Sequence, residues 1–139
     1  MLNHKIQKLF IKISQGIWLD SVETIISICR ASVVSIIYNV RLQSVGTGLR
    51  LRGAKCILVG KNVVIGRFNW IEAVIKYGNK IYSPKITIGN HVALSDFVHI
   101  SSVSEIVIGD GTLIGSKVYI GDHNHGFGSD QNTSSSFPA

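Results

Sequence analysis

The most constraining feature of this sequence is a hydrophobic position that returns every six residues. It is occupied by isoleucine, leucine or valine in three sets of three, and glycine follows it at six of the nine places. The nine positions are Val59, Ile65, Ile71, Ile88, Leu94, Ile100, Ile108, Ile114 and Ile120. These residue types make up 44 of the 139 residues, so agreement at all nine positions exceeds what chance would give.

A period of six is neither the period of a helix nor that of a strand. It predicts a three-sided coil in which each lead side chain points inward and stacks on its equivalents in neighbouring coils. Two intervals are longer. The eight residues from Ile100 to Ile108 predict a small bulge at a corner. The seventeen from Ile71 to Ile88 predict a loop that leaves the coil, where substrate contacts are common.

The first 45 residues have a different pattern and are predicted to be helical. Apolar residues recur at helical spacing from Val22 to Val40, after Asp20 and Glu23 at the spacing of a capping box. We expect this stripe to pack within the protein, although it could also lie on a bilayer surface.

The excess positive charge lies in the N-terminal part of the chain. Residues 1–55 hold eight Lys/Arg and two Asp/Glu, whereas residues 56–139 hold six of each. A basic N-terminus favours an anionic surface such as a membrane leaflet or nucleic acid, and solvated lysines explain it equally well. Because the repeat region is neutral and carries no reader motif, nucleic-acid binding is disfavoured.

Two cysteines, Cys29 and Cys56, do not make a disulfide framework, and neither a signal peptide nor a transmembrane helix is apparent. We therefore expect a cytoplasmic protein. Residues 119–130, YIGDHNHGFGSD, hold the pair His123 and His125. Such a run can ligate a metal, supply a catalytic base, or form a polar loop without chemistry.

Together, "IGD", "LIGSKVYI" and "DHNHG" make residues 46–126 resemble the hexapeptide-repeat acyltransferases. Within that family the chain is most similar to O-acetyltransferases of bacterial surface polysaccharides, of the O-antigen or colanic acid type. The resemblance implies a mainly β fold, a left-handed parallel β-helix of about three coils preceded by N-terminal α-helices. It also implies a homotrimer with active sites between subunits, acetyl-CoA as acyl donor, and a sugar or polysaccharide acceptor. The basic N-terminal helices would then contact the inner face of the cytoplasmic membrane.

The resemblance also assigns roles to individual residues. His125 ends its hexad and is the expected general base, with His123 as a second catalytic histidine. Asp122 and Asn124 are expected to hold the imidazole tautomer and to contact the substrate.

Further site residues are predicted from their places in the coil. They are His99 and Trp70 for the substrate, and Lys117, Ser101 and Ser102 for acetyl-CoA. Ordinary packing or solvation would explain each of them as well.

Two alternatives stay open. γ-Class carbonic anhydrases share the repeat and bind zinc, but four residues separate their ligand pair. Here the pair is His-x-His, and His91 and His99 do not supply the missing spacing, so no metal is expected. The second alternative is a catalytically incomplete β-helical remnant or interaction module. It arises because the chain runs from the histidines into a Ser-rich segment, 127–139, which we expect to be a flexible tail of a C-terminally truncated form.

Overall fold

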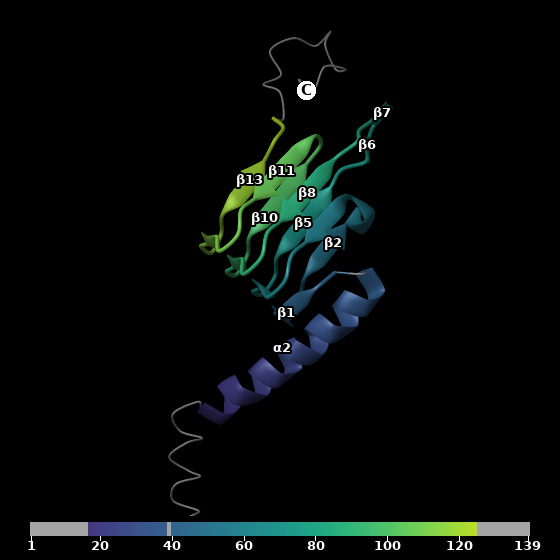
Figure 1. The fold of residues 1–139 in the computed structure, drawn as a ribbon. Helices are drawn as coiled ribbons and strands as arrows, with labels where there is room; N and C mark the ends of the chain where they lie inside the picture. Colours follow the sequence, from purple (N-terminus) through teal and green to yellow (C-terminus); the bar gives the residue numbers. More distant parts are fainter. Residues whose placement is uncertain (1–16, 39, 125–139) are drawn as a thin grey trace, which may run out of the picture.

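The structure, a computed structural model, describes residues 17–38 and 40–124. It is mainly β, with parallel sheets and one N-terminal helix, as the sequence predicts. Figure 1 shows the helix at one end of a stack of strands. Three predictions lie outside the described residues: the helix before residue 17, the position of His125, and the Ser-rich tail at 127–139.

Helix α2 (Ile17–Tyr38) contains the segment with the predicted capping box and apolar stripe. It contacts the sheets through β1, where Ala31 is buried and Nε of Arg30 donates a hydrogen bond to the carbonyl oxygen of Val45 at 3.0 Å. Most of the apolar stripe stays exposed in the single chain, and the side chains of Ile36 and Ile37 are 83% and 65% exposed. The expected packing of this stripe is therefore not found on the described part of the same chain.

The strands of the coil form three parallel sheets. Successive strands visit the first, second and third sheets in turn, so the chain winds as a three-sided coil (Figure 1). The strands are β1 (Leu42–Val45), β4 (Val63–Ile65), β9 (Ala93–Leu94) and β12 (Leu113–Ile114) in the first sheet; β2 (Arg50–Arg52), β5 (Trp70–Ala73), β10 (His99–Ser102) and β13 (Tyr119–Gly121) in the second; and β3 (Ile57–Val59), β8 (Lys85–Ile88) and β11 (Glu105–Ile108) in the third.

The nine lead residues of the repeat pair with one another in three ladders. Each ladder joins equivalent positions of neighbouring coils, as the period of six predicts. The ladders are Ile65–Leu94–Ile114, Ile71–Ile100–Ile120 and Val59–Ile88–Ile108. Seven of the nine are buried, and Val59 and Ile120 are partly buried against the same core. Removal of these aliphatic side chains from water is the main stabilisation of the coil.

The coil begins earlier than the repeat analysis indicates. Val45 pairs with Ile65, and Leu51 pairs with Ile71, so β1 and β2 extend the first two ladders by one coil. The first strand begins at Leu42, inside the range 1–45 that the sequence assigned to the helical segment. A short 3-10 helix, η1 (Ala54–Cys56), lies between β2 and β3 and lengthens this coil, which obscures the period of six there.

The seventeen-residue interval leaves the coil as a β-hairpin, in agreement with the predicted excursion. Strands β6 (Lys76–Tyr77) and β7 (Lys80–Ile81) pair antiparallel, and Gly78 occupies the turn with a φ of +58°. Figure 1 shows this hairpin extending beyond the strands of the coil. It follows β5 directly, so it stands beside the outer face of the second sheet.

Polar side chains at the corners tie each coil to the preceding one. The Oδ1 atoms of Asn90, Asp96 and Asp110 accept hydrogen bonds from backbone N–H groups one coil earlier, at 2.7–2.9 Å. Oδ1 of Asn69 accepts in the opposite direction along the stack, from the backbone N–H of Val98 one coil later, inside the core. These bonds satisfy corner N–H groups that the sheets leave unpaired.

Candidate functional site

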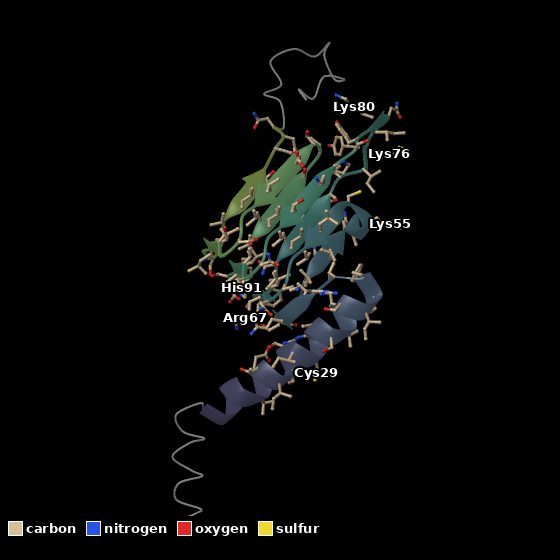
Figure 2. All side chains as sticks on the ribbon, viewed as in Figure 1. Cys29, Lys55, Arg67, Lys76, Lys80 and His91 are labelled. Carbon is tan, nitrogen blue, oxygen red and sulfur yellow. The ribbon has the colours of Figure 1, made fainter. Side chains whose placement is uncertain are left out.

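An open groove lies on the outer face of the second sheet, beside the β6–β7 hairpin. Its volume is about 740 Å³, which is within the range that accommodates a small organic ligand. It is lined by Arg52, Trp70, Glu72, Val74, Lys76, Tyr77, Tyr82, His99, Ser101, Val103, Tyr119, His123 and Asn124. Figure 2 labels one of these residues, Lys76, toward the end of the coil where the hairpin lies.

A ladder of outward-facing side chains runs up the second sheet. In register, it contains Arg50, Trp70, His99 and Tyr119. Each directly precedes an inward-pointing residue, and alternation along a strand turns it outward. The rings of Trp70 and His99 are stacked, with centroids 4.4 Å apart and planes 9° apart. The ring of Tyr119 meets that of His99 edge-on at 5.1 Å and 64°.

His99 is held in its neutral form by this packing. Burial lowers the pKa of His99, Glu72 opposes this effect, and the proximity of His123 lowers the pKa further. Nε2 of His99 and Nε1 of Trp70 are buried, and neither has a hydrogen-bond partner among the described residues. Because both atoms are closed to solvent, a ligand hydroxyl could bond to them only after the stacked rings move apart.

The carboxylate of Asp122 anchors the segment that carries the histidines. Its Oδ2 accepts hydrogen bonds from Oγ of Ser102 at 2.6 Å and from the N–H of Ser104 at 2.9 Å. Its Oδ1 accepts from the N–H of Val103 at 2.8 Å. The donors belong to the corner between β10 and β11, so one side chain joins the end of β13 to the preceding coil.

Asp122 also faces the neighbouring histidine. Nδ1 of His123 lies 3.4 Å from Oδ1 of Asp122, and the His123 side chain is only 13% exposed. Burial raises the pKa of Asp122, but the hydrogen bonds from Ser102, Val103 and Ser104 outweigh burial, so its net pKa lies below the ordinary value. Asp122 therefore stays ionised at neutral pH and favours the tautomer of His123 that carries its proton on Nδ1.

The structure brings together five of the predicted site residues. Trp70, His99, Ser101, His123 and Asn124 all line the groove. They lie on three successive coils, so the arrangement depends on the register of the ladders.

The other predicted residues lie differently. Asp122 supports the groove from beneath through Ser102, which is fully buried and donates its hydroxyl to Asp122. Lys117 is exposed at a corner with a φ of +62° and is not among the residues that line the groove. His125 lies outside the described residues. Whether these side chains contact a substrate or acetyl-CoA stays a prediction.

Several lining residues were not foreseen from the sequence. Arg52, Glu72 and Tyr119 occupy outward positions on the second sheet, and the register of the repeat places them there once the sheet is known. Lys76 and Tyr82 come from the hairpin segment, where no period applies. The outward positions could have been found by reading the residues on either side of each lead residue.

In residues 17–38 and 40–124, no three His, Cys, Asp or Glu side chains gather in an arrangement that could hold a metal ion. In the same part of the chain, no helix is both long and apolar enough to cross a membrane.

Comparison with known proteins identifies a similarity over a short segment. A segment of 41 residues is 51% identical to the Escherichia coli (strain K12) protein named "Putative lipopolysaccharide biosynthesis O-acetyl transferase WbbJ". This segment is 30% of the present chain and 21% of that protein, so the match spans about a fifth of the length of this relative. No protein-family model matches the chain, and no solved structure was found to match it.

Proposed function

We propose that the protein is an acetyl-CoA-dependent O-acetyltransferase that acts on a hydroxyl group of a bacterial surface polysaccharide or of its precursor. One observation carries the choice of acyl transfer over other chemistries, namely the 51% identity over 41 residues to a protein whose name states O-acetyl transfer. The groove supports the proposal because it places His99, His123 and several aromatic side chains where a sugar could bind.

The fold that we propose for the family is the left-handed parallel β-helix of hexapeptide repeats. Its support is the pairing of all nine lead residues in register across three parallel sheets. We further propose a homotrimer with active sites between subunits, in the cytoplasm at the inner face of the membrane. The exposed apolar residues of α2 are available for contacts of this kind.

In the proposed mechanism, His125 is the general base. Its imidazole takes the proton of the acceptor hydroxyl while the oxygen attacks the carbonyl carbon of the acetyl thioester. The new C–O bond gives a tetrahedral oxyanion, which backbone N–H groups can stabilise. The oxyanion collapses, the C–S bond breaks, and the CoA thiolate receives the proton. His123, oriented by Asp122, and Asn124 would hold the acceptor.

Acetyl-CoA would lie along the sheet above the groove. Ser101 lines the groove, and Lys117 is exposed and could approach a CoA phosphate. Ser102, the third residue predicted for CoA, would act indirectly, because its hydroxyl already donates to Asp122.

The test is a calorimetric titration of the 139-residue chain and its His125→Asn variant with acetyl-CoA. Release of the CoA thiol is then followed with a panel of hexoses and 6-deoxyhexoses as acceptors. We expect both proteins to bind acetyl-CoA and only the unmodified chain to release thiol in the presence of an acceptor. His91→Asn is the matched control, because His91 is exposed at a corner and does not line the groove.

Two results would contradict the proposal. Absence of acetyl-CoA binding by all three proteins would contradict enzymatic activity of this chain and favour a binding module. Acceptor-dependent thiol release that survives His125→Asn would remove His125 as the base and direct attention to His123.

A further inference from the structure

We propose that the groove recognises a sugar carried on a diphosphate, whose phosphate groups are bound by Arg52 and Lys76 of the groove wall and by Arg50, which pairs in register with the lining residue Trp70. This inference rests on the proposed acetyl transfer and names the chemical class of the acceptor. The diphosphate would lie toward β2, at one edge of the second sheet, and the sugar toward β13 and the histidines at the opposite edge.

The charge at the β2 edge is the first reason. Both outward side chains of β2 are arginines, and their guanidinium carbons lie 5.9 and 5.8 Å from the centroid of the same ring, that of Trp70. Glu72 is the one carboxylate among the groove-lining residues, and it contacts Arg52 only at 3.5 Å. No described carboxylate forms an ion pair with Arg50. Two guanidinium groups that share a single counter-charge favour an anionic ligand, and their planar geometry suits phosphate oxygens.

The hairpin adds positive charge on the same side. Lys76 lines the groove, and residues 74–82 contain two lysines and no acidic residue. Figure 2 shows Lys55, Lys76 and Lys80 along one edge of the coil. The surface that a ligand meets at this edge is therefore cationic, and electrostatic attraction would guide an anion toward the groove.

The aromatic residues are the second reason. Trp70, Tyr77, Tyr82 and Tyr119 line the groove and can offer ring faces or edges to a sugar or a nucleobase. Between the arginines and His123 lie the two buried ring nitrogens of Trp70 and His99, for which no partner is found among the described residues. Both atoms are closed to solvent, so they contribute to sugar binding only if the stacked rings separate.

The length of the groove favours a sugar linked to a diphosphate over a free sugar. Four strands, β2 to β13, cross the second sheet, and neighbouring strands are about 4.8 Å apart. A single sugar at the histidine end would leave the arginines uncovered, whereas a diphosphate-linked sugar would reach both ends.

The experiment measures binding of diphosphates to the 139-residue chain by the fluorescence of Trp70. A Trp18→Phe background removes the other tryptophan. The probes are inorganic pyrophosphate, uridine 5′-diphosphate, farnesyl diphosphate and free CoA. We expect the double variant Arg50→Gln/Arg52→Gln to weaken diphosphate binding at least about tenfold, as loss of charge-assisted hydrogen bonds does. Arg41→Gln, which removes an exposed arginine on β1's side of the coil, should leave binding unchanged.

Each outcome decides the inference. Tighter binding of uridine 5′-diphosphate than of pyrophosphate supports it with a nucleotide carrier, and tighter binding of farnesyl diphosphate supports it with a lipid carrier. Absence of binding in the millimolar range overturns it, as does binding that the double variant retains. Displacement of pyrophosphate by CoA with the same dependence on the arginines also overturns it, because the cations would then belong to the donor site.

Failure of this inference and failure of the proposed function are distinguishable. Diphosphate binding is measured without acetyl-CoA and does not require His125. A chain that binds acetyl-CoA and releases thiol to free hexoses, but binds no diphosphate, keeps the proposed function and loses this inference. A chain that binds diphosphates in an arginine-dependent manner, without binding acetyl-CoA, retains a diphosphate site and loses the acetyl transfer.

Discussion

Replacing Asp122 by asparagine tests how the histidine segment is held to the coil. The carboxylate accepts hydrogen bonds from Oγ of Ser102 and from the N–H groups of Val103 and Ser104, and its side chain is only 17% exposed. Asparagine has nearly the same shape, but an NH2 group replaces one carboxylate oxygen. This group donates hydrogen bonds and cannot accept one from Ser102, Val103 or Ser104. At least one backbone N–H therefore loses its acceptor, and the bonds that remain are no longer charge-assisted.

We expect the free energy of unfolding at pH 7 to fall by about 2–3 kcal/mol. Hydrogen bonds to a charged group contribute about 1.5–3 kcal/mol each, against about 0.5–1.5 kcal/mol for neutral ones, and an unmet buried donor adds to the loss. Partial access of water to Ser104, which is exposed, keeps the total below the sum of three full bonds.

The pH dependence of this loss has a definite sign. Burial raises the pKa of Asp122, but its hydrogen bonds outweigh burial, and the net pKa in the folded chain lies below the ordinary value. The stabilisation is fully present above the unfolded-state pKa of about 3.9 and is lost as the pH falls through the lower folded-state pKa. The difference between the two proteins should therefore be equal at pH 7 and pH 5 and should shrink below about pH 4.

The assay is urea unfolding at fixed protein concentration across this pH range, followed by circular dichroism. Asp110→Asn is the matched control. Asp110 also accepts two hydrogen bonds, from the backbone N–H and the side-chain amide of Asn90, at 2.7 and 3.1 Å, but it is exposed. Its replacement should cost much less. Equal stability of Asp122→Asn and the unmodified chain at pH 7, or a difference that persists undiminished at pH 3, would refute the reasoning.

Three further predictions concern the coil and the groove. Asn69→Ala should lower the free energy of unfolding by about 2 kcal/mol in urea titrations, because the N–H of Val98 loses its acceptor within the core. Gly46→Ala should cost about 1–3 kcal/mol, since a Cβ there would lie 2.5 Å from backbone of the next coil, whereas Gly115→Ala, with nothing within 4 Å, should not; equal effects would contradict this. Because burial lowers the pKa of His99, thermal stability should fall as the pH drops below about 6.5, and His99→Gln should reduce that slope; an unchanged slope would argue against buried neutral His99.

The core of the coil was predictable from the sequence because it depends on one repeating constraint. A lead residue must be apolar to pack on its equivalents, so the period of six identifies the inward positions without further information. The same register locates Trp70, His99 and Tyr119 on one outward column, since each stands directly before a lead residue. The early coil at Val45 and Leu51 was missed because η1 interrupts the spacing after it.

The groove was less predictable because its walls come from segments without a period. Lys76, Tyr77 and Tyr82 reach it through the hairpin, and the path of an excursion is set by its own turn and pairing rather than by the coil. The structural role of Asp122 was not predictable for a related reason. Its carboxylate faces His123, as expected, but it also accepts three short hydrogen bonds from the preceding coil, which no periodic position indicates.

Two parts of the candidate site lie where the spacing of six is interrupted: the hydrogen bonds that hold Asp122, and the groove wall formed by the hairpin. The two extra residues between Ile100 and Ile108 free the N–H groups of Val103 and Ser104 from the ladders, and these groups then bind Asp122. The seventeen-residue interval supplies the wall opposite the aromatic column. If every interval were six residues, the outer face of the second sheet would carry only the side chains of its own strands. No hairpin would stand beside it, and the groove would lack a wall. The candidate groove therefore combines a periodic column, formed by Trp70, His99 and Tyr119, with walls that come from the two intervals that differ from six.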